Sequence, residues 1–238
     1  MTKRIHHFRG PSLMLVAIAH IVVFLAGLAA AVTLPHGASY VTPFAPAEQV
    51  RLFFSQNATA VRISNFFLFG SAVPFGIFVA TAISRLRFYG VRAAGTNIAL
   101  FGGMSAAVAL FLSGMAGWIL STSGIADSAS LAQALYYLSF LAGGAFYSVA
   151  FGILAAGISI TSYFNRLLPQ WLFVLGMLVA ITGELSSLSL VTFPPNFLIP
   201  ITRYIGFLWM ILVAFALRRD RRLAHNIPDT NAPIVAGS

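Results

Sequence analysis

The sequence predicts an all-α membrane protein, a polytopic transmembrane helical bundle of six spans with both termini in the cytoplasm. Apolar residues make up 59% of the 238-residue chain and charged residues only 8%, against roughly 45–50% and about 25% in ordinary globular proteins. The apolar residues gather in six long runs, and lysine and arginine collect on one side of the membrane that these runs define. This composition excludes a water-soluble enzyme and a disordered chain.

Each run is long enough to cross a bilayer, because about 20 helical residues at 1.5 Å each span roughly 30 Å of hydrocarbon. Helices are expected, since the period-two alternation of a membrane β-barrel is missing. The first run is longer than the roughly 7–15 apolar residues of a cleavable signal peptide, so we interpret it as a span. The fourth run is overlong, which predicts tilting, a kink or a part outside the lipid. The predicted spans are residues 12–34, 60–84, 95–119, 133–162, 169–191 and 198–217.

These spans form one predicted domain, residues 1–222, and its orientation follows from the positive charges. If the N-terminus is cytoplasmic, that side carries 11 of the 14 lysine and arginine residues, and the other side carries Arg51, Arg62 and Arg203. Such a bias places both termini inside. The net charge of +9 is then explained by anionic lipid headgroups as partners, and nucleic acid is not expected. The Pro-containing tail, residues 223–238, is expected to be flexible and cytoplasmic.

The predicted outer loop contains an amphipathic segment, residues 45–56. Val50, Phe53 and Phe54 fall on one side of a helix drawn through it, and Glu48 and Arg51 fall on another. This pattern predicts a short helix. The helix either anchors the loop at the membrane interface or covers an outward cavity as a lid.

Small residues recur every four positions in the third and fourth spans, and such ridges let helix backbones approach closely. We therefore expect these two spans to form the tightest pair, with a dimer seam as the alternative. The ridges are Ser105, Ala109, Ser113, Gly117 and Ser121 in the third span, and Gly144, Ser148, Gly152 and Ala156 in the fourth.

Ionisable residues inside a membrane are costly, which makes Glu184 and Arg203 functional candidates. Each lies about 8 Å below the outer boundary, on either side of the turn near Pro194 and Pro195. An antiparallel hairpin would set them opposite each other, so we expect an ion pair. The pair either fastens the hairpin or belongs to an outward cavity, where Glu184 binds a cation or proton or Arg203 binds an anionic group.

A polar outer vestibule is predicted around this pair. Arg62 and Asn65 at the outer end of the second span reach a comparable depth, as do Gln133, Tyr136 and Tyr137 at the start of the fourth. The grouping rests on depth alone.

His20 is the histidine that lies within a predicted span, about 12 Å from the inner boundary. It is either a packing residue or an axial ligand of haem or a chlorophyll-type magnesium. The absence of cysteine excludes disulfides and thiolate ligands. The sequence also lacks H-E-x-x-H and G-x-x-x-x-G-K-[ST], so an enzyme is not favoured but stays open. We predict no metal site and no cofactor, with the His20 ligand as the alternative.

The stretch NRLLPQWLFVLGMLVAITGEL, from Asn165 onward, is followed by a Pro-rich turn and a last helix with an Arg-rich end. This pattern resembles the C-terminal part of six-helix bacterial membrane proteins grouped as a family of unknown function. The resemblance covers about the last third of the chain. It implies six helices and the bacterial plasma (inner) membrane, and it implies no activity and no site residues.

Three functions of different class stay open. The chain binds or moves a small solute or ion through the outward vestibule, in which case a discontinuous or kinked helix is expected, with Gly70 and Pro74 of the second span as its best candidate. Alternatively it is a non-catalytic subunit or assembly factor, with a membrane protein partner or a homo-oligomer. The third possibility is a cofactor-holding protein that uses His20.

Overall fold

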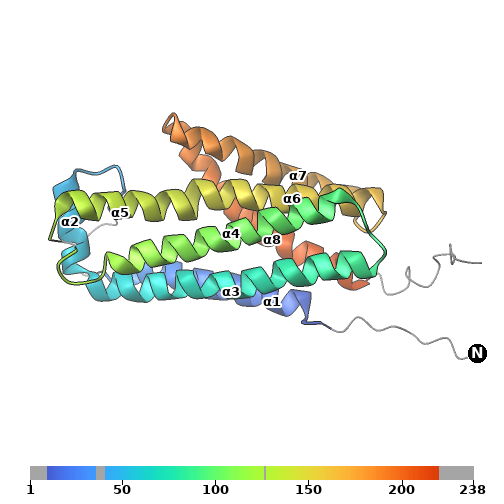
Figure 1. Cartoon of the computed structure of the whole chain (residues 1–238), viewed down its shortest axis with the longest axis horizontal. Coiled ribbons are helices and arrows are strands. Elements are labelled where there is room, and N and C mark those ends of the chain that lie inside the picture. The colour runs from blue at the N-terminus through green and yellow to red at the C-terminus, as the bar shows by residue number, and fades with distance from the viewer. Residues whose placement is uncertain (1–9, 36–40, 126, 220–238) are drawn as a thin grey trace, which may run out of the picture.

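A computed structural model describes residues 10–35, 41–125 and 127–219 of the chain. All regular secondary structure in these residues is helical (Figure 1). Six helical segments are long and apolar enough to cross a membrane. The predicted all-helical class and the six spans are therefore confirmed, and the chain fits a multi-pass integral membrane protein. Lys3, Arg4, Arg9 and the predicted tail lie outside the described residues.

The spans are built from ten helical elements, and an eleventh lies between the first two spans. The first three spans are α1 (Leu13–Thr33), α3 (Ala58–Phe88) and α4 (Ala94–Ile119). The fourth comprises α5 (Ala129–Leu141), the π-helical turn η1 (Ala142–Phe146) and α6 (Tyr147–Phe164). The fifth is α7 (Gln170–Leu185) with η2 (Ser186–Leu190), and the sixth is η3 (Pro194–Phe197) with α8 (Leu198–Arg219). The additional helix α2 (Ala47–Gln56) lies in the predicted amphipathic segment.

Local sequence signals set several of these ends. Ser12 and Ser128 cap α1 and α5, because each side chain accepts a hydrogen bond from the backbone N–H three residues later. Gly90 and Gly124 adopt φ angles of 82° and 87° in the turns after α3 and α4, a conformation that glycine adopts without strain.

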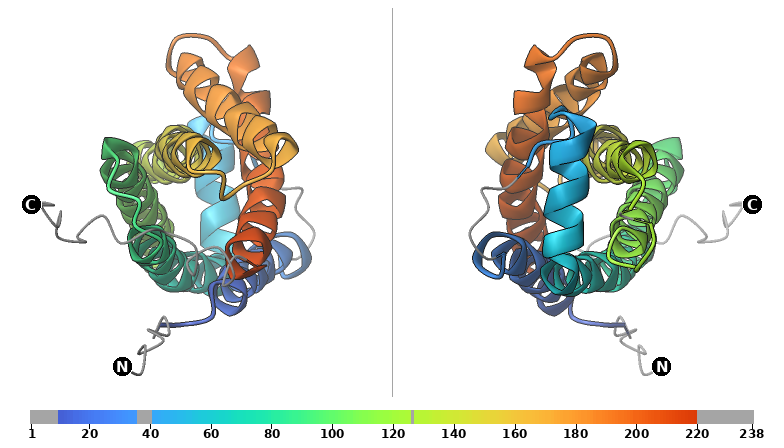
Figure 2. Two further views of the ribbon diagram at one scale, coloured as in Figure 1. Left: turned by 90° about the vertical axis from the view of Figure 1, so that its right-hand side faces the viewer. Right: turned by 90° about the vertical axis from the view of Figure 1, so that its left-hand side faces the viewer.

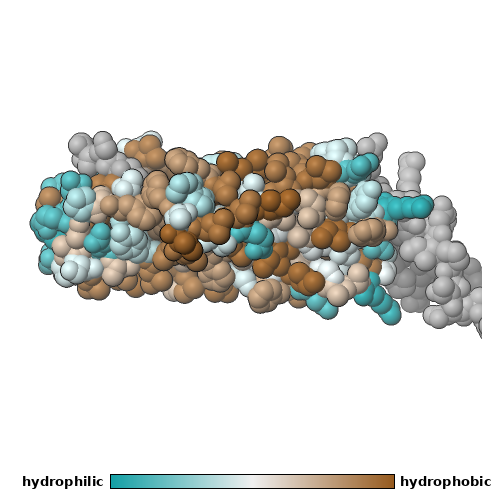
Figure 3. Space-filling model, turned by 90° about the horizontal axis from the view of Figure 1, so that it is seen from above, coloured by the Kyte–Doolittle hydropathy of each residue, from teal (hydrophilic) through white to brown (hydrophobic). Residues whose placement is uncertain are grey.

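The spans alternate in direction, so α1 begins and α8 ends at the same end of the bundle (Figure 1). At the opposite end α2 lies across the helix tips, as the right-hand view of Figure 2 shows. We call this the α2 end. Helices adjacent in the chain pack together, and α8 also returns to α1, which closes the bundle. Hydrophobic side chains dominate the middle of the face shown in Figure 3, and hydrophilic ones gather toward its two ends, as expected for a membrane-crossing bundle.

The third and fourth spans pack closely, and Ser113 of the predicted ridge bonds to Ser139 of the fourth span. Glycines outside the predicted ridges make further close approaches. A Cβ atom on Gly157 of α6 would lie 2.7 Å from the backbone nitrogen of Ala99 in α4. A Cβ atom on Gly102 would likewise lie 2.7 Å from the carbonyl oxygen of Ala150. Backbone meets backbone at these positions, so the helices approach more closely than side chains with a Cβ atom would allow.

The predicted ridge of the fourth span faces other neighbours. A Cβ atom on Gly152 would lie 3.0 Å from the carbonyl oxygen of Ala180 in α7, and one on Gly144 would meet Ile199 of α8 at 3.2 Å. These small residues do permit close helix contacts, as predicted, but the neighbours of the fourth-span ridge are α7 and α8 and not the third span.

Candidate functional site

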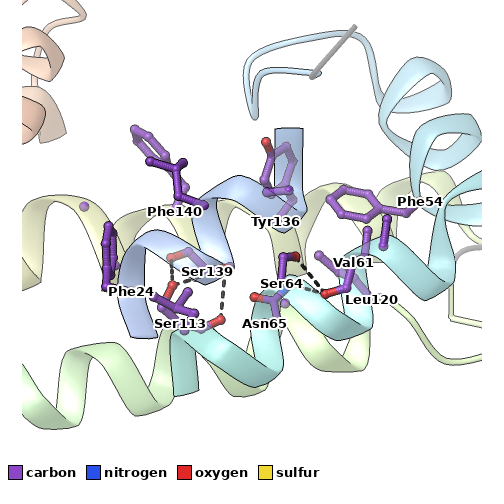
Figure 4. A pocket seen from close by; sticks show the side chains of 18 of the residues that line it. Phe24, Phe54, Val61, Ser64, Asn65, Ser113, Leu120, Tyr136, Ser139 and Phe140 are labelled. Atoms are coloured by element: carbon purple, nitrogen blue, oxygen red, sulfur yellow. Dashed lines mark hydrogen bonds between the residues drawn. The ribbon is translucent and has the colours of Figure 1, made fainter. Parts of the chain in front are cut away.

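A pocket of about 310 Å³ lies within the α2 end of the bundle. Residues of α1, α3, α4, α5, η1 and α8 form its wall, and Phe53 and Phe54 of α2 contribute to its lining. Figure 4 shows Phe24 near one end of the pocket and Phe54 near the other. Most of the lining is apolar; its polar side chains are Ser64, Asn65, Ser113, Tyr136, Ser139 and Arg203.

Arg203 is the charged residue among those that line the pocket. Its guanidinium lies between two aromatic rings, 4.9 Å from the centre of Phe24 and 4.8 Å from the centre of Tyr147. One terminal nitrogen donates a hydrogen bond to the carbonyl oxygen of Gly143. The Nε atom is buried and has no hydrogen-bond partner among the described residues. Cation–π contacts and one carbonyl thus stabilise the guanidinium, but every one of these partners is neutral.

The carbonyl that accepts from Arg203 belongs to the π-helical turn η1. A π-turn replaces the regular hydrogen-bonding pattern of an α-helix and is frequent at functional sites. A Cβ atom on Gly143 would lie 2.4 Å from Oγ of Ser113, so only glycine lets η1 come this close to α4. The fourth span therefore contains a π-turn within one continuous helix. A discontinuous helix at Gly70 and Pro74 is not found, since α3 runs through both residues as one helix with Pro74 inside it.

The expected ion pair of Glu184 and Arg203 is not formed. Oγ1 of Thr202 donates to Oγ1 of Thr182 at 2.9 Å, which fixes the faces that α7 and α8 turn toward each other. Successive helical residues are 100° apart, so Glu184 lies about 200° around α7 from Thr182. Glu184 is accordingly exposed on the surface of the bundle, outside the pocket, whereas Arg203 is turned into it. The two charges therefore lie on different sides of the helix pair.

Two of the predicted vestibule residues line the pocket. Asn65 donates from its side-chain amide to the carbonyl of Val61 at 2.8 Å. It packs onto Gly117, where a Cβ atom would overlap its Oδ1 atom. Tyr136 lines the pocket near α2, and its ring centre lies 4.9 Å from that of Phe54.

Arg62 and Gln133 do not line the pocket; they fasten the elements around it. Arg62 donates to the carbonyl and to the hydroxyl of Ser121 at 3.0 and 3.3 Å, which ties the start of α3 to the end of α4. Gln133 donates to the carbonyl of Ala45 at 3.1 Å, in the segment that leads into α2. The predicted place of these two residues in the vestibule is therefore wrong.

The helix α2 covers the outer side of the pocket. Its apolar residues Val50, Phe53 and Phe54 are buried in a cluster with Val61, Leu120, Ala132 and Tyr136 on the tips of α3, α4 and α5. The hydroxyl of Tyr136 also donates to the carbonyl of Val41 at 2.6 Å, in the segment before α2. This packing favours the lid interpretation over an interface anchor.

The opposite face of α2 is polar, as predicted. Arg51 donates hydrogen bonds of 2.6–3.0 Å to both carboxylate oxygens of Glu48. These bonds lower the pKa of Glu48. Because both side chains lie at the surface, the pair contributes little to stability.

His20 lies below the pocket and is completely buried. Its Nδ1 atom lies 2.9 Å from the carbonyl oxygen of Ser71 and must donate to it. The ring centres of Phe75 and Phe207 lie 4.9 and 5.4 Å from the imidazole. Its Nε2 atom is buried and has no hydrogen-bond partner among the described residues, and the haem or chlorophyll-type ligand stays a prediction. Pro74 of α3 has no N–H to bond the carbonyl of Gly70, which weakens the helix at this turn. The hydrogen bond from His20 to the next carbonyl, that of Ser71, compensates for part of this loss.

Several residues of the pocket were not predicted from the sequence as site residues. Ser113 and Ser139 join α4 to α5 through reciprocal bonds, in which each hydroxyl donates to the other residue's carbonyl at 2.8 and 3.0 Å (Figure 4). Phe24 and Tyr147 enclose the guanidinium of Arg203. Apolar and small residues of these types are common throughout membrane helices, so they carry no distinguishing signal.

No protein-family model, no curated protein and no solved structure matches this chain significantly. The resemblance of its last third to a six-helix bacterial family stays a prediction. The assignment of function therefore rests on the geometry of the pocket.

Proposed function

We propose that this membrane protein binds a small solute in the pocket at the α2 end, with α2 as the cover. The observation that carries the proposal is the cavity of about 310 Å³, lined by helices from most of the chain and by Arg203. Ligand pockets typically measure about 300–1,000 Å³ and combine an apolar wall with a few polar groups. A cavity of this size accommodates about ten waters or one small organic molecule.

The proposal places the α2 end outside the cytoplasm, in a bacterial plasma membrane. Among the described residues, Arg85, Arg87, Arg92 and Arg166 lie in the turns at the opposite end or beside them, which supports this orientation by the positive-inside rule. Movement of the solute across the membrane is part of the proposal. The π-turn η1 contributes Gly143 and Gly144 to the pocket wall, and π-turns are frequent at functional sites, which supports this part of the proposal.

Cysteine accessibility tests this proposal, because the chain contains no cysteine of its own. Ser64 lines the pocket, and its hydroxyl bonds only within α3, to the carbonyl of Val61. We expect the Ser64→Cys variant to react with a membrane-impermeant maleimide added from outside intact cells. The matched control is Ser148→Cys, because Ser148 is completely buried away from the pocket. Equal labelling of both variants, or labelling of Ser64→Cys only from the cytoplasmic side, would show the proposal to be wrong.

A second candidate function, that of a subunit in a larger complex, is favoured by the position of Glu184. This carboxylate is exposed on α7, beside Ile181, Leu185 and Leu188, whose exposed fractions are 53%, 45% and 50%. A carboxylate beside a lipid-facing apolar stripe is costly, and a partner's cation would offset that cost.

Native mass spectrometry of gently extracted protein tests this second candidate. The subunit function predicts a partner or a second copy that is retained by the wild type and lost in Glu184→Gln. The Gln133→Ala variant is the control for a polar change elsewhere in the protein. A monomer in all three samples would exclude this function, and an absorption spectrum of the same samples would detect a coloured cofactor.

A further inference from the structure

We infer that the solute is an organic anion, a carboxylate on a small apolar body, and that Arg203 is its charge partner. This inference rests on the proposed function of the pocket. It is carried by three observations: an uncompensated cation in the wall, the engagement of nearly all other polar groups, and the apolar character of the remaining lining.

The charge of Arg203 is not neutralised by an acidic residue within the described ranges. Three acidic side chains are described there. Glu48 is paired with Arg51, Asp127 is exposed in the turn between α4 and α5, and Glu184 is exposed on the surface of α7. Burying a cation without a carboxylate is unfavourable, and its neutral partners offset only part of that cost. An anion in the pocket would supply the missing charge.

The hydroxyl groups of the pocket are already engaged as donors. Ser64 donates to the carbonyl of its own helix, Ser113 and Ser139 donate to each other's carbonyls, and Tyr136 donates to the carbonyl of Val41. Arg203 keeps an unpartnered Nε–H, and among the described residues its terminal nitrogens make one hydrogen bond, to the carbonyl of Gly143. A guanidinium offers five N–H donors in the fork geometry that a carboxylate fits. The free donors therefore match an anion and do not match a polyhydroxyl solute such as a sugar.

The rest of the wall defines the body of the ligand. Phe24, Phe53, Phe54, Phe140 and Ile199 supply aromatic and aliphatic surface around the cavity. Burial of apolar ligand surface against such a wall is favourable, whereas a hydrated inorganic anion would lose its water without compensation. A benzoate-sized or hexanoate-sized acid fits a cavity of about 310 Å³.

Equilibrium binding of radiolabelled benzoate to the full-length protein in lipid nanodiscs tests the inference. We expect saturable binding that hexanoate displaces and that benzamide, the neutral isostere of benzoate, does not. Arg203→Gln is expected to weaken benzoate binding roughly tenfold to a hundredfold, the range for a lost charge-assisted hydrogen bond. Arg62→Gln, the control, removes a charge at the same end of the bundle but outside the pocket and is expected to keep the wild-type affinity.

Several outcomes would overturn the inference. Equal displacement of benzoate by benzamide and by hexanoate would show that the pocket does not select for the negative charge of the ligand. This comparison needs only the wild-type protein. If inorganic phosphate displaces benzoate and the organic acids do not, the ligand does not need an apolar body. If a folded Arg203→Gln variant keeps the wild-type affinity, Arg203 is not the charge partner. If none of these acids binds but Ser64→Cys is labelled from outside, the inference of an anionic ligand is wrong and the proposed solute pocket is still supported.

The competition also distinguishes two sources of the same chemistry. A carboxylate on an apolar body comes either from water as a soluble acid or from the bilayer as a fatty acid. Stronger displacement by hexanoate than by palmitate assigns the pocket to a soluble acid, and the reverse order assigns it to a lipid-derived acid. Either order supports Arg203 as the charge partner.

Discussion

Replacing Arg203 by methionine is expected to make the protein more stable and to abolish anion binding. Methionine keeps an unbranched, flexible stem and removes the part-buried guanidinium charge, whose desolvation costs several kcal/mol when burial is complete. The variant loses the cation–π contacts with Phe24 and Tyr147 and the hydrogen bond to Gly143, which together offset part of that cost. We expect a net gain of about 1–2 kcal/mol in the free energy of unfolding without ligand, measured by titration with a denaturing detergent.

Without ligand we expect Arg203→Met to be more stable than the wild type, and with bound benzoate we expect the wild type to be the more stable of the two. Benzoate at 100 times its dissociation constant would stabilise the wild type by about 2.7 kcal/mol and leave Arg203→Met unchanged. Arg62→Met is the matched control, because it removes the bonds to Ser121 and lies outside the pocket. A loss of stability in Arg203→Met, as large as that of a typical core truncation, would show that Arg203 is retained for structure and not for binding.

The Phe54→Ala substitution is expected to release α2 from the pocket. The ring of Phe54 is buried between α2 and the tips of α3 to α5, with its centre 4.9 Å from that of Tyr136. Removing a buried phenylalanine side chain costs about 3–5 kcal/mol. Here the lost free energy is that of docking the short helix α2 onto the bundle. The docked state, in which α2 covers the pocket, is then little favoured over the undocked state. We expect Ser64→Cys in this background to react with maleimide at least about tenfold faster, as a loss of this size permits.

The control for this substitution lies on the same helix. Leu52 is 40% exposed, so Leu52→Ala removes an apolar side chain from α2 with little change in docking. Its labelling rate should match that of the parent Ser64→Cys variant. An unchanged rate in Phe54→Ala would mean that α2 is not the cover of the pocket.

The sequence was sufficient to predict the helices, because the length of an apolar run is set by the thickness of the bilayer. The amphipathic segment was also recognisable, since its pattern is local to about three turns of helix. Arg203 was identified as a site residue for a similarly general reason: a charge within a span needs an explanation.

The rotation of each helix was not predictable from one sequence. The sequence predicts that Glu184 and Arg203 face each other, yet the contact between Thr182 and Thr202 turns them to different sides. Rotation depends on packing between helices, and small residues such as Gly152 permit several partners. The same limit applies to Arg62 and Gln133, whose side chains fasten neighbouring elements and do not line the pocket.

The π-turn η1 was unpredictable for a different reason. Its residues, Ala142–Phe146, are as apolar and small as those of an ordinary membrane helix. The adjacent glycines at 143 and 144 are compatible with a break but also with a tight helix crossing. The contacts of Gly143 with Arg203 and Ser113 become visible only when three helices are brought together.

Charge-selective modification of Ser64→Cys tests most directly whether the pocket is open to water and carries the positive charge of Arg203. The rate with the anionic 2-sulfonatoethyl methanethiosulfonate is compared with that of its cationic trimethylammonium analogue, each relative to its rate with a free thiol. We predict that the anionic reagent reacts faster by on the order of tenfold, and that Arg203→Met removes this preference. Equal rates, or a faster cationic reagent, would contradict an anion site at Arg203.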